Sequence, residues 1–264
     1  MPAEGAPIAW ALHTELDLDT VNLHLAELEP EGLLGLAEQN GVTTVYLSRR
    51  SELELPGRWE PVADRDWDAF WKAGIEPVTV GEVTILPPWL DGEVAAVGEI
   101  VLVLEPAQAF GTGHHATTTG CLRALQESDL SRRSVLDVGT GTGVLALAAA
   151  RLGARRVLAL DTDPLAVEAA AGNAVLNDCA VEVREGSLDA AGTETFDVVV
   201  ANLDTNTLTA LSFELVACLA PDGVMFLSGV STERAHEVVD ALAAQGMRAV
   251  VRPDGEWAVL SLSG

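Results

Sequence analysis

The sequence almost lacks lysine. Lys72 is its single lysine among 264 residues, and 15 basic side chains face 40 acidic ones, giving a formal net charge of −25 at pH 7. Binding to nucleic-acid phosphates needs clustered Lys and Arg, so a sequence-independent nucleic-acid binder is disfavoured. An anionic membrane surface would also repel the chain. The charge therefore favours cationic proteins or neutral small molecules as partners, with plain solubility as the alternative explanation.

Cysteine and long apolar segments are scarce as well. Cys121, Cys179 and Cys218 lie far apart and form no CxxC pair, so we expect small buried thiols in a reducing cytosol. No stretch approaches the roughly 20 apolar residues that span a bilayer, and residues 1–14 lack the pattern of a signal peptide. His114 and His115 have no metal-ligand partners nearby in the sequence, so we expect a cytoplasmic protein without a metal site.

The first 62 residues have the pattern of a small α/β domain. A strand is expected over 8–13 and another, rich in β-branched residues, over 42–47. Between them, residues 19–39 show helical spacing that Pro30 interrupts. About 60 residues bury little core, so this domain is marginally stable alone.

Residues 63–74 predict a short linker helix that opens on acidic residues and closes on Gly74. Trp67, Phe70 and Trp71 stand at i, i+3 and i+4, which places them on one face. We expect a packed connector between two domains; a surface that stacks on substrate is the alternative.

From residue 75 to residue 264 the pattern is first β and then alternates regularly between strand and helix. The expected strands are 78–80, 83–86, 101–104, 134–138, 156–160, 181–184, 196–201 and 223–228, and the expected helices are 143–152, 164–177, 207–219 and 232–245. Such alternation predicts a parallel, doubly wound α/β sheet. Two consecutive strands, 247–252 and 257–262, should close the sheet with an antiparallel hairpin.

The strongest chemical signal is a strand that runs into a glycine-rich turn and then into a helix: Val135-Leu-Asp137-Val-Gly139-Thr-Gly141-Thr-Gly143-Val144. Glycines let a backbone approach a ligand closely, and a helix N-terminus offers free N–H groups. The dinucleotide fingerprint would need glycine where Val144 stands, which disfavours an NAD-dependent dehydrogenase. Asp161 follows at the end of the next strand, where a carboxylate can accept both hydroxyls of a ribose. A tight turn without a ligand is the alternative.

This combination resembles the class I S-adenosylmethionine-dependent methyltransferases, which have a Rossmann-like seven-stranded sheet with an antiparallel C-terminal hairpin. The resemblance implies S-adenosylmethionine as cofactor, with Asp137 helping to hold its amino-acid end. The cofactor's sulfonium and ammonium groups suit an acidic site. A pyrophosphate would be a poor ligand beside Asp137 and Asp161 without a compensating Arg.

Asn202 ends the fourth strand of the alternating region, at the edge where ligands bind in such sheets. Methyltransferases that act on amino nitrogen often carry Asn or Asp here, followed by Pro-Pro and an aromatic residue. By resemblance, the Asn202 oxygen would accept a hydrogen bond from the target amine and orient its lone pair. The Pro-Pro-aromatic part is missing, so a turn-forming Asn is the alternative.

A third signal is the glycine-bounded loop Phe110-Gly-Thr-Gly-His114-His115-Ala-Thr117-Thr118-Thr119. It leads into a helix whose first turn is rich in Thr, which caps helices well. A loop that carries Phe110 could cover a cofactor and exclude water; a plain N-capped helix is the alternative. His115 is expected to be a structural hydrogen-bonding residue rather than a base.

Together with Ser228-Gly229 and Glu256-Trp257, these motifs look like those of the bacterial ribosomal protein L11 methyltransferases over about residues 62–264. The resemblance implies a small N-terminal α+β ferredoxin-like domain (1–62) that recognises the ribosomal protein, the linker helix, and a methyltransferase domain (75–264). That domain would trimethylate lysine side chains and the N-terminal amine. The implied site has Asn202 as catalytic residue, no metal, and cofactor contacts from Phe110, Thr118, Asp137, Gly139, Gly141, Gly143, Asp161 and Asn202.

Two departures from the family pattern concern the site. His114-His115-Ala116 stands where the family often has Thr-His-Pro, which affects the stiffness of the loop. Leu203-Asp204-Thr205 replaces Ile-Leu-Ala, which places an extra carboxylate near the amine.

The resulting hypothesis is a protein-lysine N-methyltransferase, monomeric, that acts on the free basic ribosomal protein before ribosome assembly and makes no direct contact with nucleic acid. Acidic residues outnumber basic ones by 11 to 3 in residues 1–62, by 3 to 2 in 63–74 and by 26 to 10 in 75–264. The negative charge is thus spread along the chain, which suits a cationic protein substrate. An RNA or small-molecule methyltransferase and a non-catalytic cofactor-binding module remain alternatives.

Overall fold

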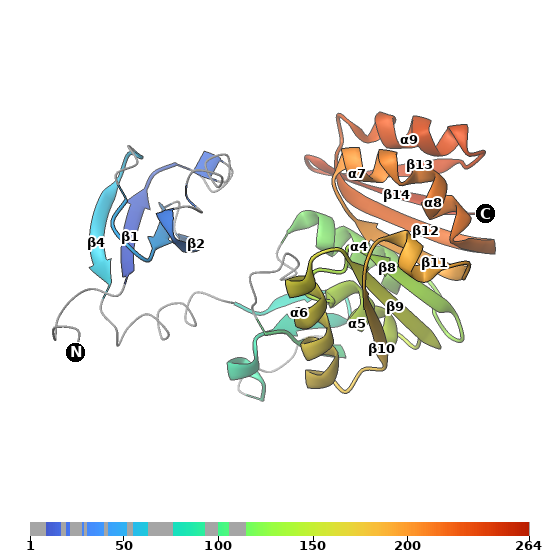
Figure 1. Cartoon of the computed structure of the whole chain (residues 1–264), viewed down its shortest axis with the longest axis horizontal. Helices are drawn as coiled ribbons and strands as arrows, with labels where there is room; N and C mark the ends of the chain where they lie inside the picture. The colour runs from blue at the N-terminus through green and yellow to red at the C-terminus, as the bar shows by residue number, and fades with distance from the viewer. Residues whose placement is uncertain are drawn as a thin grey trace. The chain divides into compact units, whose positions relative to one another are not determined.

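The computed structural model describes residues 9–16, 20–21, 28, 31–39, 42–51, 55–62, 76–92, 100–105 and 115–263. The chain divides into two compact units, Met1–Glu76 and Pro77–Gly264. In Figure 1 the described strands of the first unit are blue to light blue, and the elements of the second run from teal to red. The predicted linker helix and the Phe110 loop lie outside the described residues. Both therefore stay predictions.

The first unit contains an antiparallel four-stranded sheet in the order β2-β3-β1-β4. Its strands are β1 (Ala9–Thr14), β2 (Leu33–Gln39), β3 (Val42–Leu47) and β4 (Arg58–Val62). A small core of Leu12, Val21, Leu28, Val45 and Leu47 supports it.

The strand predicted over 42–47 is confirmed, whereas the helical prediction over 19–39 is wrong in its second half, which forms β2. Gly32, with a φ of +84°, immediately precedes β2, whose residues pair with β3. A ferredoxin-like domain also needs two helices. The described residues contain only short helical pieces there, so that detail stays a prediction.

The second unit begins with a three-stranded sheet in the order β5-β6-β7. Its strands are β5 (Val78–Val80), β6 (Val83–Leu86) and β7 (Ile100–Val103), close to the predicted ranges, and a 3-10 turn, η2 (Pro88–Leu90), follows β6. Side chains from all three strands join the core that lies beneath α4 (Ala116–Gln126) and α5 (Val144–Arg151).

A seven-stranded sheet in the order β10-β9-β8-β11-β12-β14-β13 forms the rest. The remaining elements are β8 (Ser134–Val138), β9 (Arg156–Asp161), α6 (Pro164–Leu176), β10 (Val181–Glu185), η3 (Leu188–Ala191), β11 (Phe196–Asn202), α7 (Thr205–Ala210), α8 (Ser212–Ala217), β12 (Leu219–Ser231), α9 (Ala235–Ala244), β13 (Ala249–Asp254) and β14 (Trp257–Ser263). Strands β8 to β12 pair in parallel, whereas β14 is antiparallel to both β12 and β13. The predicted doubly wound sheet and its closing hairpin are confirmed.

The sheet separates two apolar cores because successive side chains of a strand point to opposite faces. In β9, Val157 and Ala159 join the core beneath α4 and α5, while Leu158 and Leu160 join the core beneath α7 to α9. Figure 1 shows α4, α5 and α6 on one face and α7, α8 and α9 on the other. Both faces are therefore covered, as a parallel sheet requires.

The helix predicted over 207–219 is two helices, α7 and α8, separated at Leu211. The Thr209 hydroxyl donates to the Thr205 carbonyl at 2.7 Å, a back-bond that bends helices. The strand predicted over 223–228 is longer, since β12 begins at Leu219 and passes through Asp222 with a φ of +61°.

Cys121 and Cys218 are buried, Cys179 is half-buried, and all three are free thiols. None of the helices in the described part of the chain combines the length and the hydropathy that a membrane span requires. Among the same residues, no group of three or more His, Cys, Asp or Glu side chains could hold a metal ion.

Candidate functional site

A pocket of about 320 Å³ opens at the carboxyl ends of β8, β9, β10 and β11. This is the edge where open α/β sheets bind ligands. Its lining residues are Val138, Gly139, Gly141, Asp161, Thr162, Asp163, Ala166, Gly186, Ser187, Asn202, Leu203, Thr207 and Leu211. Four of the eight predicted site residues are among them: Gly139, Gly141, Asp161 and Asn202.

The glycine-rich turn is held close to its neighbours, which explains two of its glycines. Gly139 has a φ of +71°, and a Cβ there would lie 2.3 Å from Leu203 Cδ2. Gly143 has a φ of +85° and begins α5, and a Cβ there would lie 3.2 Å from Ala170 on α6. Larger residues would strain the backbone and push the turn away from both neighbours.

Asp161 connects the end of β9 to the turn. Its Oδ2 accepts from the Gly141 N–H at 2.9 Å, and its Oδ1 accepts from the Asp163 N–H at 3.0 Å. Asp163 in turn caps α6 by accepting from the Leu165 N–H. Each carboxylate oxygen has room for a second hydrogen bond, so Asp161 can hold the turn and still accept from hydroxyl groups in the pocket.

Asp137 is fully buried and does not line the pocket. Its Oδ2 accepts from the Thr140 hydroxyl at 2.6 Å and from the Ala146 N–H at 3.1 Å, so it ties the turn to α5. Its Oδ1 is buried without a hydrogen-bond partner. Desolvation raises the pKa of Asp137 to about 7. The contact with a ligand's amino-acid end stays a prediction.

Asn202 is the last residue of β11, and a hydrogen bond from its side-chain amide fixes the orientation of that side chain. Its Nδ2 donates to the Thr118 hydroxyl at 3.2 Å, and Thr118 is itself fully buried in α4. The Asn202 Oδ1 is buried and has no partner. A buried acceptor without a donor is costly, and because Asn202 lines the pocket, a donor on a ligand would satisfy it.

Thr118 bonds the Asn202 side chain and does not line the pocket, and Gly143, the last glycine of the turn, faces Ala170 of α6 rather than the pocket. The structure thus brings together seven of the eight predicted residues, some lining the pocket and others supporting it. Phe110 is the exception because it falls outside the described residues.

His115 caps α4 and contacts an aromatic residue. The Thr117 N–H donates to its Nδ1 at 3.3 Å, and the Thr117 hydroxyl lies 2.7 Å from the same nitrogen. Its ring meets Trp257 edge to face with centroids 4.9 Å apart. These contacts agree with the structural role expected for His115.

Asp204, the extra carboxylate, is the N-cap of α7. Its Oδ1 accepts from the N–H groups of Asn206 and Thr207 at 2.9 and 3.1 Å, and its Oδ2 accepts from the Thr207 hydroxyl. The bond from that hydroxyl lowers the pKa of Asp204. Its oxygens are therefore engaged in capping, which disfavours a role as a base.

Sequence reasoning missed Gly186 and Ser187, which follow β10, and Thr207 and Leu211 on the α7 side of the pocket. Gly186 and Ser187 could have been predicted from the sequence, because they come shortly after a predicted parallel strand, as Asp161 does. Thr207 and Leu211 could not, since only the observed course of α7 brings them to the pocket.

Comparisons with known proteins agree with this geometry. A family model described as ribosomal protein L11 methyltransferase matches residues 33–263. A ribosomal protein L11 methyltransferase of Deinococcus radiodurans is 43% identical over 260 residues, which cover 92% of this chain and 94% of the relative. One from Thermus thermophilus is 37% identical over 254 residues, with 96% and 98% covered.

A solved structure is also similar. A ribosomal protein L11 methylase of Lactobacillus delbrueckii subsp. bulgaricus matches with a TM-score of 0.67 and 31% identity, covering 72% of this chain and 98% of that chain.

Proposed function

The chain belongs to the ribosomal protein L11 methyltransferase family, and from that premise we propose that it methylates the lysine side chains and the N-terminal amine of ribosomal protein L11. It is a class I methyltransferase that uses S-adenosylmethionine. The observation that carries the proposal is the buried, partnerless Oδ1 of Asn202 in the pocket wall.

The residues of the pocket fit S-adenosylmethionine. Asp161 has acceptor capacity left for ribose hydroxyls. The turn from Gly139 to Gly143 leads into the N-terminus of α5, which attracts a carboxylate. Ala166, Leu203 and Leu211 supply an apolar wall for a flat base. The partnerless Oδ1 of Asn202 can accept from an amine donor.

When bound, the cofactor would supply an electrophilic methyl group: the amine nitrogen would form a bond to that carbon in line as the carbon–sulfur bond breaks and S-adenosylhomocysteine leaves. The amine must be neutral to react, and with a reference pKa of about 10.4 a neutral lysine costs roughly 4–5 kcal/mol at pH 7. Burial in the site lowers this cost by disfavouring the ammonium form. Asn202 then accepts one N–H and aims the lone pair, while Thr118 fixes the orientation of Asn202.

Positioning is thus the main contribution of the protein. Of the described carboxylates in the pocket wall, Asp161 bonds the turn and is assigned to ribose hydroxyls, and Asp163 caps α6; Asp204, outside the wall, caps α7. We therefore propose that the proton leaves to solvent without a dedicated base.

The remaining aspects of the proposal concern the partner. Residues 1–62 would recognise L11, the connector 63–74 would join them to the methyltransferase domain, and the enzyme would act in the cytoplasm as a monomer on free L11, without touching nucleic acid. The excess of acidic over basic side chains, 40 against 15, supports capture of a basic protein. The affinity for L11 should fall as salt rises, because salt screens such attraction.

The test is incubation of the purified chain with methyl-labelled S-adenosylmethionine, separated ribosomal proteins and ribosomal RNA. Label in L11, at lysines and the N-terminal amine by peptide mass spectrometry, supports the proposal. Label in RNA, in another small molecule, or in nothing at all contradicts it.

A further inference from the structure

Asn173 on α6 is a buried amide that reaches the glycine-rich turn. It is 1% exposed and does not line the pocket. Its Nδ2 donates to the Thr142 carbonyl at 2.9 Å, and its Oδ1 accepts from the Glu105 N–H at 2.9 Å. The amide nitrogen is therefore paired with the turn, and the amide oxygen is paired with Glu105, which follows the three-stranded sheet. A buried polar side chain with both ends paired rigidifies what it joins.

The bond to Thr142 fixes one particular peptide. In a trans peptide the carbonyl and the following N–H point in opposite directions. The Thr142 carbonyl is held by Asn173, and the N–H of Gly143, on the other side of the same peptide, donates to the Thr140 carbonyl at 2.9 Å. The peptide is thus held from both sides at the point where α5 begins.

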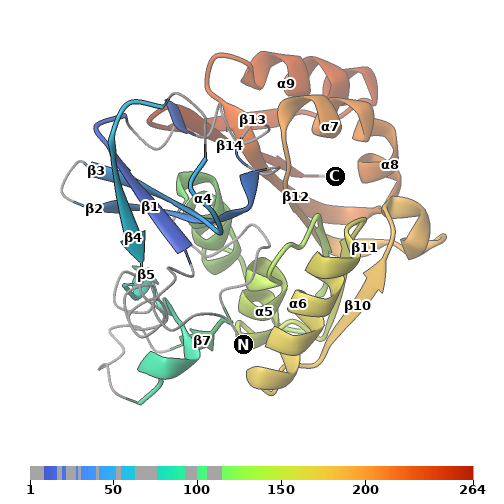
Figure 2. The same ribbon diagram turned by 60° about the vertical axis from the view of Figure 1, so that its left-hand side comes forward.

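The same helix holds the turn at a second point. At its N-terminus, α6 is capped by Asp163, whose N–H bonds Asp161, and Asp161 accepts from the Gly141 N–H. One turn before Asn173, Ala170 packs against Gly143. Figure 2 shows α5 and α6 side by side. The turn is therefore held to α6 through Asp161 at one end and through Asn173 at the other.

We propose that Asn173 is a positioning residue for S-adenosylmethionine: its amide fixes the Thr142–Gly143 peptide, and with it the shape of the turn and the N-terminus of α5 that face the cofactor. The inference rests on the proposed function, since it takes this pocket as the cofactor site. Glycines with positive φ make the turn intrinsically flexible, so a bond from outside the turn lowers the entropy lost when the cofactor binds.

The chain offers a matched control. Asn177 lies one turn further along α6 and is 7% exposed. Its Nδ2 donates to the carbonyls of Val103 and Asn173, and its Oδ1 accepts from the Val103 N–H, with no bond to the turn. Asn173→Asp and Asn177→Asp both replace a buried amide by an isosteric group that cannot donate when ionised. Only the first places an acceptor against the Thr142 carbonyl.

The test is calorimetric binding of S-adenosylhomocysteine to the full-length chain and both variants, with thermal unfolding of each. For Asn173→Asp we expect the Kd to rise about ten-fold or more, whereas Asn177→Asp keeps the wild-type Kd within about two-fold despite a similar loss of Tm. In turnover assays the KM for S-adenosylmethionine should rise in Asn173→Asp while the KM for L11 stays constant.

Equal Kd values for the two variants, or a KM change for both substrates alike, would overturn the inference. If Asn173→Asp does not fold, Asn173→Ala and Asn177→Ala form the same comparison with the same outcomes. A wild-type chain that fails to bind S-adenosylhomocysteine would overturn the proposed function itself, and this inference with it.

Discussion

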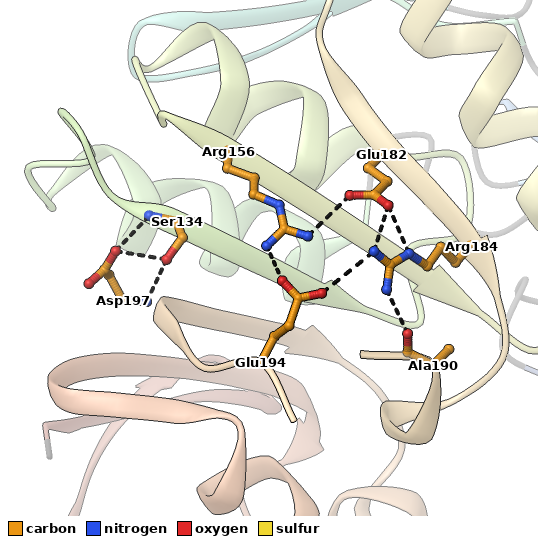
Figure 3. Close-up of polar contacts among 7 residues, drawn as sticks. All are labelled: Ser134, Arg156, Glu182, Arg184, Ala190, Glu194 and Asp197. Carbon is orange, nitrogen blue, oxygen red and sulfur yellow. Dashed lines mark hydrogen bonds and ion pairs between the residues drawn. The ribbon is translucent and has the colours of Figure 1, made fainter. Parts of the chain in front are cut away.

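The two ends of the seven-stranded sheet differ in whether their polar side chains have hydrogen-bond partners. At the carboxyl ends, the Oδ1 atoms of Asn202 and Asp137 are buried without partners. Near the amino ends, Figure 3 shows a closed network: Arg156 bonds Glu182 and Glu194, and Arg184, from the second half of β10, bonds Glu182.

The amino-end network extends to both sides. Arg184 also contacts Glu194 at 3.5 Å and donates to the Ala190 carbonyl, and Asp197 accepts from the N–H and hydroxyl of Ser134 at 2.7 Å each (Figure 3). Arg156 lies over the ring of Phe196, 5.7 Å from its centroid. The charged side chains of this network are therefore paired with one another by hydrogen bonds and ion pairs.

The contrast shows where a ligand is needed. A buried acceptor that lacks a partner costs stability, and a fold tolerates one where a ligand supplies the donor, as the pocket allows at Asn202. Paired and half-exposed ions need nothing further, and screening makes each pair contribute little.

Replacing Asn202 should have the largest effect. In Asn202→Ala we expect kcat for L11 methylation to fall about 10²-fold at saturating cofactor, because the amine loses its orienting acceptor. The matched control is Asn206→Ala, which removes an exposed amide that bonds Arg234 outside the pocket wall. A normal kcat in Asn202→Ala would refute the role of Asn202.

Asp161→Asn should weaken cofactor binding. We expect the Kd for S-adenosylhomocysteine to rise about ten-fold, since an amide presents one acceptor oxygen instead of two. Asp240→Asn, on the exposed side of α9, removes the same charge far from the pocket wall and should leave the Kd unchanged. If both variants weakened binding equally, general charge rather than Asp161 would be responsible.

The burial of Asp137 predicts a pH dependence of stability. Its folded pKa of about 7 lies above the 3.8 of an aspartate in water, so its contribution to the free energy of unfolding is fully present below pH 4 and is lost as pH rises through about 7. Urea unfolding from pH 4 to pH 8 should show this loss in the wild type, and Asp137→Asn should reduce it. Parallel pH profiles for the two proteins would show that Asp137 is not the group responsible.

The amino-end network should give the smallest effect. Glu182→Gln breaks pairs whose side chains are one-third to nearly one-half exposed, so we expect a loss of less than about 1 kcal/mol. Neither kcat nor the Kd for S-adenosylhomocysteine should change. A large drop in either would mean that the amino ends take part in ligand binding.

The sequence was informative where local pattern and topology agree. Strand–helix alternation predicts a parallel sheet, and the carboxyl ends of parallel strands meet at one edge. This is why Gly139, Asp161 and Asn202, distant in the chain, could be assigned to one site. Asp204 also carried a readable signal, because an Asp just before a helix is a common N-cap.

Other features depend on contacts that local pattern does not contain. The helical spacing of Leu28 and Leu36 continues into β2, which forms because β3 offers it an edge. Asn173 reaches Thr142 and Glu105 across 31 and 68 residues. Nothing in the segment around Asn173 distinguishes it from other helical asparagines.

Hydrogen–deuterium exchange of the full chain with and without S-adenosylhomocysteine tests directly whether the ligand binds at the carboxyl ends of the strands. We expect slower exchange of the backbone amides in residues 139–145 and 186–187, at the carboxyl ends of the strands, and unchanged exchange in residues 192–196 beside the paired amino ends. No protection in 139–145 at saturating ligand, or protection confined to the amino ends, would contradict this expectation.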